Sequence, residues 1–424
     1  MKHLILMEQL KDSFNDACLG CSITNELIFD KSIISNFANQ ANHLMTSPLL
    51  NANQKLNIMN KYLLPILTYP LQAAALNKIP KTILYTLDSI IRSTVKEITN
   101  LPISTPTNMI YSPEKYRGLA MVSCRWEVLL QHFSINKKLS ALPDGLLHAV
   151  YDCQTEMEEC RRVLGVIGDT ARQLRKALRE MAFTKWCALP NFGIGCKFFS
   201  HYPKVNSFVY DKNSLSISEW VQCMKMSFNY ANLGGVPGSK YFEETKSDRC
   251  RHCPTTGQHA RETISHVLGK CDFGNLLRNE RHLRIKHYIT DLLIKKGFVC
   301  FQEAFCYDIY GSDRRIDILA FDSRSNRAFI IDPTIQFENN EDHEAIVQQE
   351  KKDRYETCVQ DLATRYSQFG RREYEVIGLW FGARGSIANQ VVTFFDRFEL
   401  DKAHLQTISE SILILISCHA TTPH

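Results

Sequence analysis

The sequence predicts a multidomain fold with a mainly α-helical N-terminal part, a small cysteine–histidine knuckle and a C-terminal α/β domain. Three observations predict this organisation. Apolar residues recur every three or four positions in the first part of the chain, four cysteine and histidine residues stand in order between residues 250 and 271, and β-like runs alternate with helical stretches after about residue 291. At 424 residues the chain is longer than one ordinary domain, so several domains are expected.

Composition narrows the class of protein. With 44% hydrophobic and 22% charged residues, the chain is typical of globular proteins that bury a core. We find neither an uninterrupted apolar run of membrane-spanning length nor a secretory signal at the start, so no membrane partner is expected. A net charge of +5 permits nucleic-acid binding without requiring it, and fifteen scattered cysteines favour reduced thiols in an intracellular compartment.

Residues 1–150 and 151–240 are expected to form two helical regions. In the first, the stretch 81–102 carries an apolar stripe at helical spacing, which we interpret as core packing. The stripe consists of Ile83, Leu87, Ile91, Val95 and Ile98. In the second, the arginines between Glu159 and Phe183 are interpreted as a solvated helix face.

A metal knuckle is predicted within residues 241–290. Four residues share the spacing C-x2-C-x12-H-x4-C: Cys250, Cys253, His266 and Cys271. Two thiolates on a tight turn, followed by a histidine and a thiolate one helical turn apart, supply the four ligands of structural zinc and leave no open position for catalysis. His252 and His259 are competing ligands, ranked lower because neither completes the second pair.

A basic helical segment, RNERHLRIKHYI, follows the knuckle. A charge run of this kind commonly faces solvent, but beside a metal knuckle it is a candidate for contacts with nucleic-acid phosphates. The residues assigned this role are Arg281, His282, Arg284 and Lys286. Both interpretations stay open on the sequence alone.

The C-terminal α/β domain is expected over residues 291–400, and one hairpin within it places two carboxylates together. Two apolar runs flank the loop DSRSNR, and counting inward from it pairs Phe321 with Ala328. The same register places Asp317 opposite Asp332, where two carboxylates repel each other unless a cation lies between them. Hard oxygen ligands select Mg²⁺ or Mn²⁺, so the pair predicts a divalent-metal site. The alternative, in which an aspartate merely ends its strand, is weaker for a facing pair.

A metal-assisted hydrolase also needs a cation beside the reacting phosphate. A lysine two residues after the second aspartate could supply this cation, but that position is Thr334. The lysine is therefore expected from a helix in the stretch QQEKKDRYETC. Lys351 is assigned to orient the attacking water and to stabilise the phosphate in the transition state. Arg354 and Tyr355, one turn beyond, are further candidates. So is Glu303 in FQEAF, although a surface position is its simpler interpretation.

These motifs resemble those of one known family. An aspartate after a basic residue, an Asp-x-Thr strand and a Glu-Lys-x-x-basic-Tyr helix resemble the restriction-like endonuclease, of the PD-(D/E)xK class, of site-specific non-LTR retrotransposons. In that family a Cys-Cys-His-Cys knuckle and an Arg-His-x-Arg-like segment precede the nuclease, as they do here. Upstream, NQKLNIMNKYLLPILTYPL, LDSIIRSTVKEITNLP and YRGLAM resemble the reverse-transcriptase thumb.

The chain departs from the family pattern at three points. Ile316 replaces the proline that usually precedes this aspartate, Asp317. The proline has no chemical role at that position, so the replacement should be harmless. Pro333 cannot donate to a sheet ladder, so it implies an edge position or a bulge next to Asp332. No Tyr/Phe-Ala-Asp-Asp polymerase motif occurs, so reverse transcription by this chain alone is not expected.

The resemblance implies the C-terminal part of such a polyprotein, with residues 401–424 as a C-terminal helix or tail. It implies a nuclear endonuclease that cuts double-stranded DNA for target-primed reverse transcription, with Mg²⁺ or Mn²⁺ and Zn²⁺ as metals and the element's RNA as a further partner. The alternative is an inactive nucleic-acid-binding remnant of the polyprotein. A weaker one is a structural accessory to a polymerase.

Overall fold

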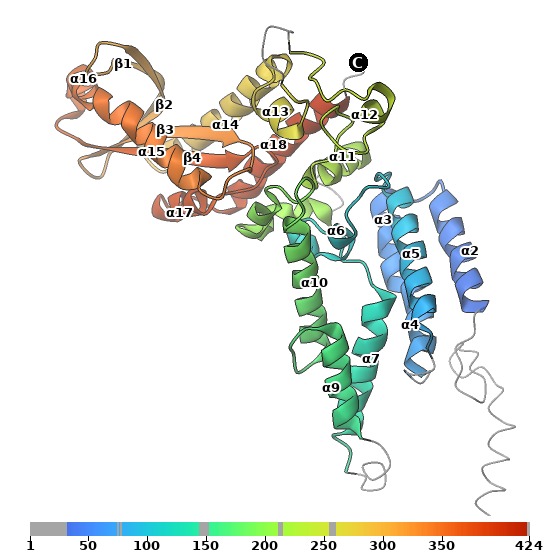
Figure 1. The fold of residues 1–424 in the computed structure, drawn as a ribbon. Coiled ribbons are helices and arrows are strands. Elements are labelled where there is room, and N and C mark those ends of the chain that lie inside the picture. Colours follow the sequence, from blue (N-terminus) through green and yellow to red (C-terminus); the bar gives the residue numbers. More distant parts are fainter. Residues whose placement is uncertain are drawn as a thin grey trace, which may run out of the picture. The chain divides into compact units, whose positions relative to one another are not determined.

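The computed structural model describes residues 32–73, 76, 79–143, 152–210, 215–253 and 260–421. The chain divides into two compact units, Met1–Pro113 with Gly118–Lys185 and Glu114–Arg117 with Trp186–His424 (Figure 1). This division falls after Lys185, whereas the sequence placed boundaries at residues 150 and 240. His259, a competing metal ligand in the sequence interpretation, lies outside the described residues.

The first unit is built from helices, and none of its described residues lies in a strand. Its elements are α2 (Ser32–Thr46), α3 (Ala52–Ile58), η1 (Met59–Leu63), α4 (Leu64–Ala73), α5 (Lys81–Ile98), α6 (Thr107–Tyr111), α7 (Cys124–Leu139), α9 (Cys153–Leu164) and α10 (Ala171–Cys187). No helix in the described part of the whole chain is both long enough and apolar enough to cross a membrane.

The apolar stripe predicted for residues 81–102 forms the inner face of α5. Four of its five residues are buried: Ile83, Leu87, Ile91 and Val95. Asp88, on the same helix, is fully buried and accepts hydrogen bonds from the Cys124 N–H at 2.6 Å and from Arg125 Nε at 2.8 Å. A carboxylate at the first amides of a helix satisfies donors that lack an intrahelical partner. Asp88 therefore joins α5 to the N-terminus of α7.

The arginines between Glu159 and Phe183 are only partly solvated. Arg162 is exposed and pairs with its neighbour Glu159 at 2.6 Å, as a solvated face predicts. Arg175, however, pairs with Glu127 of α7 at 2.7 Å, and Arg179 donates to a backbone carbonyl at 2.9 Å. These two arginines help to join α10 to the rest of the first unit.

The second unit combines short helices with one sheet. Its helical elements before the sheet are η3 (Glu114–Tyr116), η4 (Cys196–Ser200), η5 (Pro203–Val209), α11 (Ile217–Ser227), α12 (Lys240–Thr245), α13 (Ile264–Gly269), η6 (Asp272–Gly274) and α14 (Asn275–Lys295). The remaining elements are β1 (Phe298–Tyr307), β2 (Asp313–Asp322), β3 (Arg327–Gln336), α15 (His343–Tyr355), η7 (Glu356–Cys358), α16 (Val359–Arg365), η8 (Ser367–Phe369), β4 (Glu373–Gly382), α17 (Asn389–Arg397) and α18 (Ala403–Thr421). Residues 291–400 therefore contain the four strands together with helices.

The four strands form one sheet in the order β1-β2-β3-β4. The strands β1, β2 and β3 are antiparallel neighbours, whereas β4 runs parallel to β3. In the β2–β3 hairpin Phe321 pairs with Ala328, which confirms the predicted register, and the ladder ends at the pair Ile318–Ile331. Asp317 and Asp332 are thus the next residues along the two strands, where the ladder stops.

The sequence suggested an edge position or a bulge at Pro333, and the structure places this residue in a central strand. It pairs with Leu379 of β4, and the ladder to β2 has already ended at Ile331. Because proline has no N–H to donate, the open side of β3 at this point accommodates it. The same opening leaves room for side chains of other elements to reach the neighbouring Asp332.

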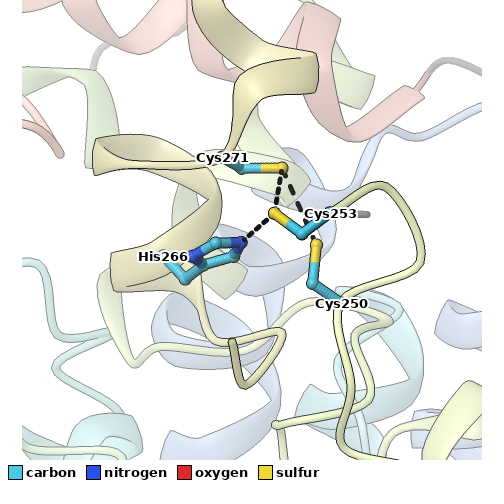
Figure 2. A group of neighbouring side chains, drawn as sticks. All are labelled: Cys250, Cys253, His266 and Cys271. Carbon is cyan, nitrogen blue, oxygen red and sulfur yellow. Dashed lines mark hydrogen bonds between the residues drawn. The ribbon is translucent and has the colours of Figure 1, made fainter. Parts of the chain in front are cut away.

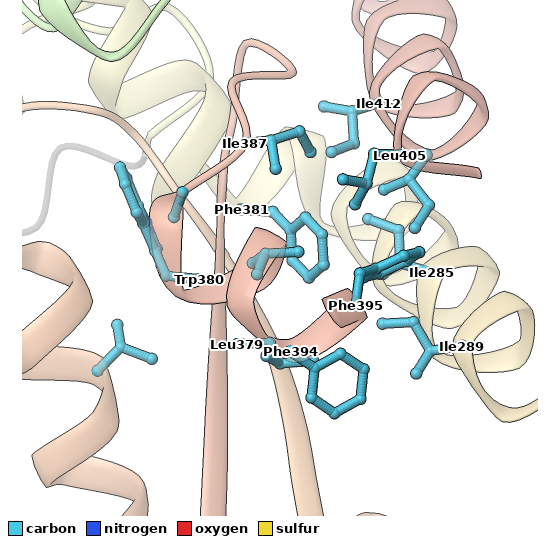
Figure 3. Packing of buried hydrophobic residues seen from close by; sticks show 14 of the residues in the cluster. Ile285, Ile289, Leu379, Trp380, Phe381, Ile387, Phe394, Phe395, Leu405 and Ile412 are labelled. Atoms are coloured by element: carbon cyan, nitrogen blue, oxygen red, sulfur yellow. The ribbon is translucent and has the colours of Figure 1, made fainter. Parts of the chain in front are cut away.

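The larger core of the second unit packs the sheet against α14, α17 and α18. Figure 3 shows residues from β4, from its following loop and from the three helices: Leu379, Trp380, Phe381, Ile387, Ile285, Ile289, Phe394, Phe395, Leu405 and Ile412. A second cluster joins β2 and β3 to α15 and α16. Strands buried on both faces explain the nearly continuous apolar runs of the hairpin. The stretch 401–424, expected as a helix or tail, contributes α18 to the core, beside α14 (Figure 1).

A fully buried ion pair ties the segment before α14 to the sheet. Arg384 Nε and Glu338 Oε2 are 3.0 Å apart, and both side chains are completely inaccessible to solvent. The same guanidinium donates to Asn229 Oδ1 at 2.7 Å and to the Ile194 carbonyl at 3.0 Å. The guanidinium of Arg117, also buried, donates to the Arg384 carbonyl at 2.7 Å. These contacts are the physical reason why residues 186–240 and 114–117 belong to the second unit.

Gly195 is required where this network approaches the backbone. Its φ of +72° is strained for other residues, and a Cβ there would lie 2.0 Å from the Glu338 carbonyl oxygen and 2.3 Å from Arg384 Nη2. Glycine is therefore needed here for the close contact as well as for the backbone conformation.

Glu338→Ala is expected to destabilise the second unit by about 3–5 kcal/mol, because it leaves the Arg384 charge buried without its counterion. Glu341→Ala is the control, since the Lys197–Glu341 pair is more than half exposed on both sides and exposed pairs contribute at most about 1 kcal/mol. Urea unfolding of the two variants measures the difference. Equal unfolding midpoints would contradict the role given to the buried pair.

Candidate metal centre and acidic site

Four ligand side chains gather where the sequence predicts the knuckle (Figure 2). Cys271 Sγ lies 3.7 Å from Cys250 Sγ and 4.0 Å from Cys253 Sγ. Cys253 Sγ is 3.2 Å from His266 Nε2, and all four ligand atoms lie within 4.8 Å of one another. Around a tetrahedral zinc ion with Zn–S bonds near 2.3 Å, sulfur atoms are roughly 3.8 Å apart. The quartet can therefore hold a metal such as zinc.

Backbone hydrogen bonds place these ligands. The Cys250 N–H donates to the Ala260 carbonyl at 2.9 Å, which closes the loop that carries the first two cysteines. Thr263 caps α13 by accepting the His266 N–H at 3.2 Å, and the Cys271 N–H donates back to the His266 carbonyl at 2.9 Å. The histidine is thus fixed within α13, and the last cysteine is fixed just beyond the C-terminal end of this short helix.

Burial favours the neutral forms of Cys271 and His266. It raises the pKa of the Cys271 thiol to about 12 and lowers the pKa of the His266 imidazole. A metal binds the thiolate, so binding has to release thiol protons. His252, the other competing ligand, stacks on Phe273 with ring centroids 4.0 Å apart and is not part of the quartet.

A buried carboxylate, lysine and tyrosine lie together where the hairpin ladder ends. Lys351 Nζ is 3.1 Å from Asp332 Oδ1, and the Tyr355 hydroxyl donates to Asp332 Oδ2 at 2.9 Å. Thr334 Oγ1 also donates to Asp332 Oδ1, at 3.1 Å. Lys351 and Tyr355 are four residues apart on α15, so they share one face of the helix. Three of the predicted site residues, Asp332, Lys351 and Tyr355, are therefore in direct contact.

Asp317 lies close enough to Asp332 for the two charges to interact. Burial raises the pKa of Asp332, the Lys351 ammonium opposes the rise, and the Asp317 carboxylate adds to it. Asp317 has a partner of its own, because His282 Nε2 is 3.0 Å from its Oδ2. Within the described residues, the knuckle quartet is the only group of three or more His, Cys, Asp or Glu side chains whose ligand atoms all come within 4.8 Å of one another.

The basic segment of α14 does not form a single exposed face. Arg281 and Lys286 are buried, with 4% and 1% of their surfaces exposed. Arg281 donates to two backbone carbonyls, and Lys286 pairs with Glu303 of β1. Arg284 is exposed and pairs with Glu280 on its own helix. A phosphate contact from Arg281 or Lys286 would first require the loss of these buried partners.

The two remaining candidates, Glu303 and Arg354, pair with other charged residues. Glu303 is half exposed, and its backbone adopts a positive φ of +52°, which is uncommon for a residue other than glycine. Arg354 is exposed and pairs with Glu350 at 3.8 Å, one turn back on α15, so it does not join Asp332.

The contact between His282 and Asp317 was not found from the sequence, which assigned His282 to nucleic-acid binding. The spacing of His282 and Lys286, one helical turn apart, does place both on one face of α14. Both meet carboxylates of the sheet, Asp317 on β2 and Glu303 on β1. The missing information was the packing of α14 on these strands.

Known proteins similar to this chain are Pol polyproteins. The retrovirus-related Pol polyprotein from type-2 retrotransposable element R2DM of Drosophila melanogaster is 24% identical over 348 residues, which are 80% of this chain and 31% of that protein. Two Pol polyproteins from type-1 retrotransposable element R2 of Popillia japonica are 21% and 24% identical over 77% and 60% of this chain. No family model matches the chain.

The chain spans only part of each relative. It covers 31% of the Drosophila protein, and 65% and 33% of the two Popillia proteins. Identity is low, but the similarity extends over 60–80% of the chain and is not confined to one motif. The chain is thus similar over most of its length to the Pol polyproteins of R2 non-LTR retrotransposons, and the resemblance to part of such a polyprotein that the sequence predicts is confirmed.

Proposed function

We propose that the second unit is a metal-dependent DNA endonuclease of a retrotransposon polyprotein. The observation that carries the proposal is the contact of Asp332 with Lys351 and Tyr355, beside Asp317, where the hairpin ladder ends. Two carboxylates and a cation in one place are the groups that metal-assisted hydrolysis of a phosphodiester needs. The similarity to R2 Pol polyproteins supports a protein that acts on nucleic acid.

The metal proposed for the acidic site is a hard divalent cation such as Mg²⁺ or Mn²⁺. A carboxylate offers about four acceptor positions, and Asp332 uses three of them for Lys351, Tyr355 and Thr334. Asp317 adds a second carboxylate, and Mg²⁺ usually binds only one or two protein carboxylates while keeping water and phosphate oxygens. A cation bound there would polarise a phosphate oxygen and lower the pKa of a bound water.

The residues of the chain take distinct parts in this proposal. Lys351 Nζ, next to Asp332, is placed to hold the attacking water and to offset charge that develops on the phosphate. Tyr355 fixes the Asp332 carboxylate through Oδ2. Burial and the Asp332 charge raise the pKa of Tyr355, so its hydroxyl remains a hydrogen-bond donor.

The proposed target is double-stranded DNA, with the element's RNA as a further partner and the nucleus as the site of action. Of the cations assigned to nucleic-acid binding, Arg284 is best placed for phosphate contacts, because it is exposed and its ion pair with Glu280 lies on the surface. Contacts of this kind act through charge, so they add affinity without sequence specificity.

We also propose that the knuckle quartet binds Zn²⁺ in a structural role. Zinc content near one ion per chain is expected for protein purified without chelator, because a closed four-ligand site of this type binds a single ion. Cys253→Ser removes one ligand and should lower both the zinc content and the melting temperature. Elemental analysis and thermal unfolding measure the two effects.

The control for this prediction is Cys300→Ser. Cys300 is a partly buried cysteine of β1 outside the quartet, so its substitution should leave the zinc content unchanged. Wild-type protein that contains no metal would contradict the assignment.

The alternative function is a nucleic-acid-binding remnant that has lost cleavage. It is favoured by one observation: among the described residues, Asp317 and Asp332 do not belong to a close group of three or more ligand side chains, and each of them has a partner of its own. Incubation of the full chain with supercoiled plasmid separates the two proposals. Nicked circles that form with Mg²⁺ or Mn²⁺ and disappear with chelator support the endonuclease, whereas plasmid binding without nicking supports the remnant.

A further inference from the structure

One side chain of helix α14 contacts the acidic site. His282 Nε2 is 3.0 Å from Asp317 Oδ2, with 33% of the histidine side chain and 15% of the aspartate side chain exposed. An ionised carboxylate only accepts hydrogen bonds, so the imidazole Nε2 is the donor. The bond links a helix to a strand and limits the rotation of the Asp317 carboxylate about its side-chain bonds.

The helix that carries His282 is itself held on both sides of this residue. Arg281 donates to backbone carbonyls at 3.2 and 3.4 Å, and Lys286 pairs with Glu303 of β1. Ile285, between them, is buried in the core of the second unit. His282 therefore projects from a rigid support, which is the condition under which a hydrogen bond can fix the orientation of its partner.

The two aspartates are supported in parallel ways. Lys351 and Tyr355 of α15 donate to Asp332, and His282 of α14 donates to Asp317. The two helices contact the sheet independently. Each carboxylate thus has a donor from its own helix.

We propose that His282 is a positioning residue of the endonuclease, which holds the Asp317 carboxylate in the orientation that binds the divalent cation together with Asp332. The inference rests on the metal site of the proposed function, and it assigns to His282 the orientation of one of the two carboxylate ligands, Asp317. Hydrogen-bond partners of metal ligands typically contribute about 10- to 100-fold to metal affinity or activity. A loss of that size is expected when the donor is removed.

The test compares three variants of the zinc-loaded full chain. His282→Ala removes the donor, and His282→Gln keeps an amide N–H that can reach the position of Nε2. His287→Ala is the matched control, because His287 is an exposed histidine of the same helix. Titration with Mn²⁺ alone, followed by the electron paramagnetic resonance signal of the free ion, gives the affinity without DNA, and plasmid nicking as a function of Mn²⁺ concentration gives the activity.

The expected result is about 10- to 100-fold weaker Mn²⁺ binding in His282→Ala, with a matching rise in the Mn²⁺ concentration needed for nicking. His282→Gln should recover most of the affinity, and His287→Ala should equal the wild type. A purely structural role would instead lower the melting temperature without a selective change in Mn²⁺ affinity. If His282→Ala proves unstable, His282→Leu keeps the bulk without a donor and takes its place.

The outcomes also separate this inference from the proposed function. Wild-type protein that binds Mn²⁺ but does not nick DNA would overturn the endonuclease, while loss of Mn²⁺ binding in His282→Ala would still support the role of His282. Unchanged Mn²⁺ affinity in His282→Ala would overturn the inference even if the wild type nicks DNA. Wild-type protein that binds no Mn²⁺ would overturn both.

Discussion

Asp332→Ala is expected to abolish Mg²⁺-dependent nicking and to leave DNA binding close to that of the wild type. The substitution removes a proposed metal ligand and the acceptor of both Lys351 and Tyr355. Asp332 is 4% exposed, so its loss does not remove a surface that DNA can touch. Asp332→Asn keeps the shape of the side chain but removes the charge and replaces one acceptor oxygen by a donor amide, and it should also be inactive.

The effect on stability has two opposing parts. Loss of the carboxylate ends its repulsion with Asp317, which by itself would stabilise the fold. It also removes the nearer counterion of the Lys351 ammonium, which is 7% exposed, and leaves only the half-exposed Glu350 at 4.0 Å. A buried charge that loses its main partner is strongly destabilising. We therefore expect a net loss of stability in the alanine variant, measured by urea unfolding, and nicking has to be compared at a temperature where all variants are folded.

The control for both measurements is Asp313→Ala, an exposed aspartate at the start of β2. It changes the net charge by the same amount and should keep wild-type nicking. Nicking has to be compared at equal DNA occupancy, so that binding and cleavage are not confused. Wild-type activity in Asp332→Ala would mean that the aspartates are structural and would favour the nucleic-acid-binding remnant.

Lys351→Met is expected to slow nicking by roughly 10²- to 10³-fold, the typical effect of removing one group that stabilises developing charge. Methionine keeps the apolar stem in the buried position and loses only the ammonium. The single-turnover rate at saturating Mg²⁺ measures the effect, because it separates the chemical step from DNA binding and product release.

Lys352→Met is the matched control for this substitution. Lys352 is the next residue on α15, about 100° around the helix, and it is less buried than Lys351. Lys352 has the same charge as Lys351 and is its direct neighbour in the sequence. Equal rates for the two variants would remove the assignment of Lys351 and leave the contact with Asp332 as a structural ion pair.

The hairpin could be predicted because its information is local. Two apolar runs and a six-residue polar loop determine which residues pair, and a shift by one residue would turn every buried side chain to the other face. The pair Phe321–Ala328 follows from that count. The ligand spacing of the knuckle is local as well, which is why Cys250, Cys253, His266 and Cys271 could be named together.

The partners of α14 could not be predicted, because they depend on contacts between distant segments. The sequence suggested that Arg281 and Lys286 lie on a charged surface. In the structure Arg281 contacts the knuckle helix α13 and Lys286 contacts the sheet. Burial then turns both cations into internal hydrogen-bond donors. The pair Arg384–Glu338 shows the same difficulty, since its 46-residue separation leaves no periodic signal.

The division of the chain after Lys185 has the same origin. The sequence predicted one helical region over residues 151–240. The buried contacts of Arg384 with Asn229 and Ile194 instead attach the second part of that stretch to the sheet. Buried polar contacts therefore determine where the second unit begins, and turn residues in the sequence do not mark that boundary.

The position of Arg117 has a consequence for how such a gene can be recombined. Its guanidinium, fully buried, donates to Asn206 Oδ1 and to the Arg384 carbonyl, each at 2.7 Å, although residues 114–117 are encoded in the middle of the stretch for the first unit. A crossover after residue 185 would pair one parent's Arg117 with the other parent's receiving pocket. Such an exchange preserves the fold only when the two parents have the same arginine at position 117 and the same acceptors for it. The second unit is therefore inherited together with the four upstream codons for residues 114–117.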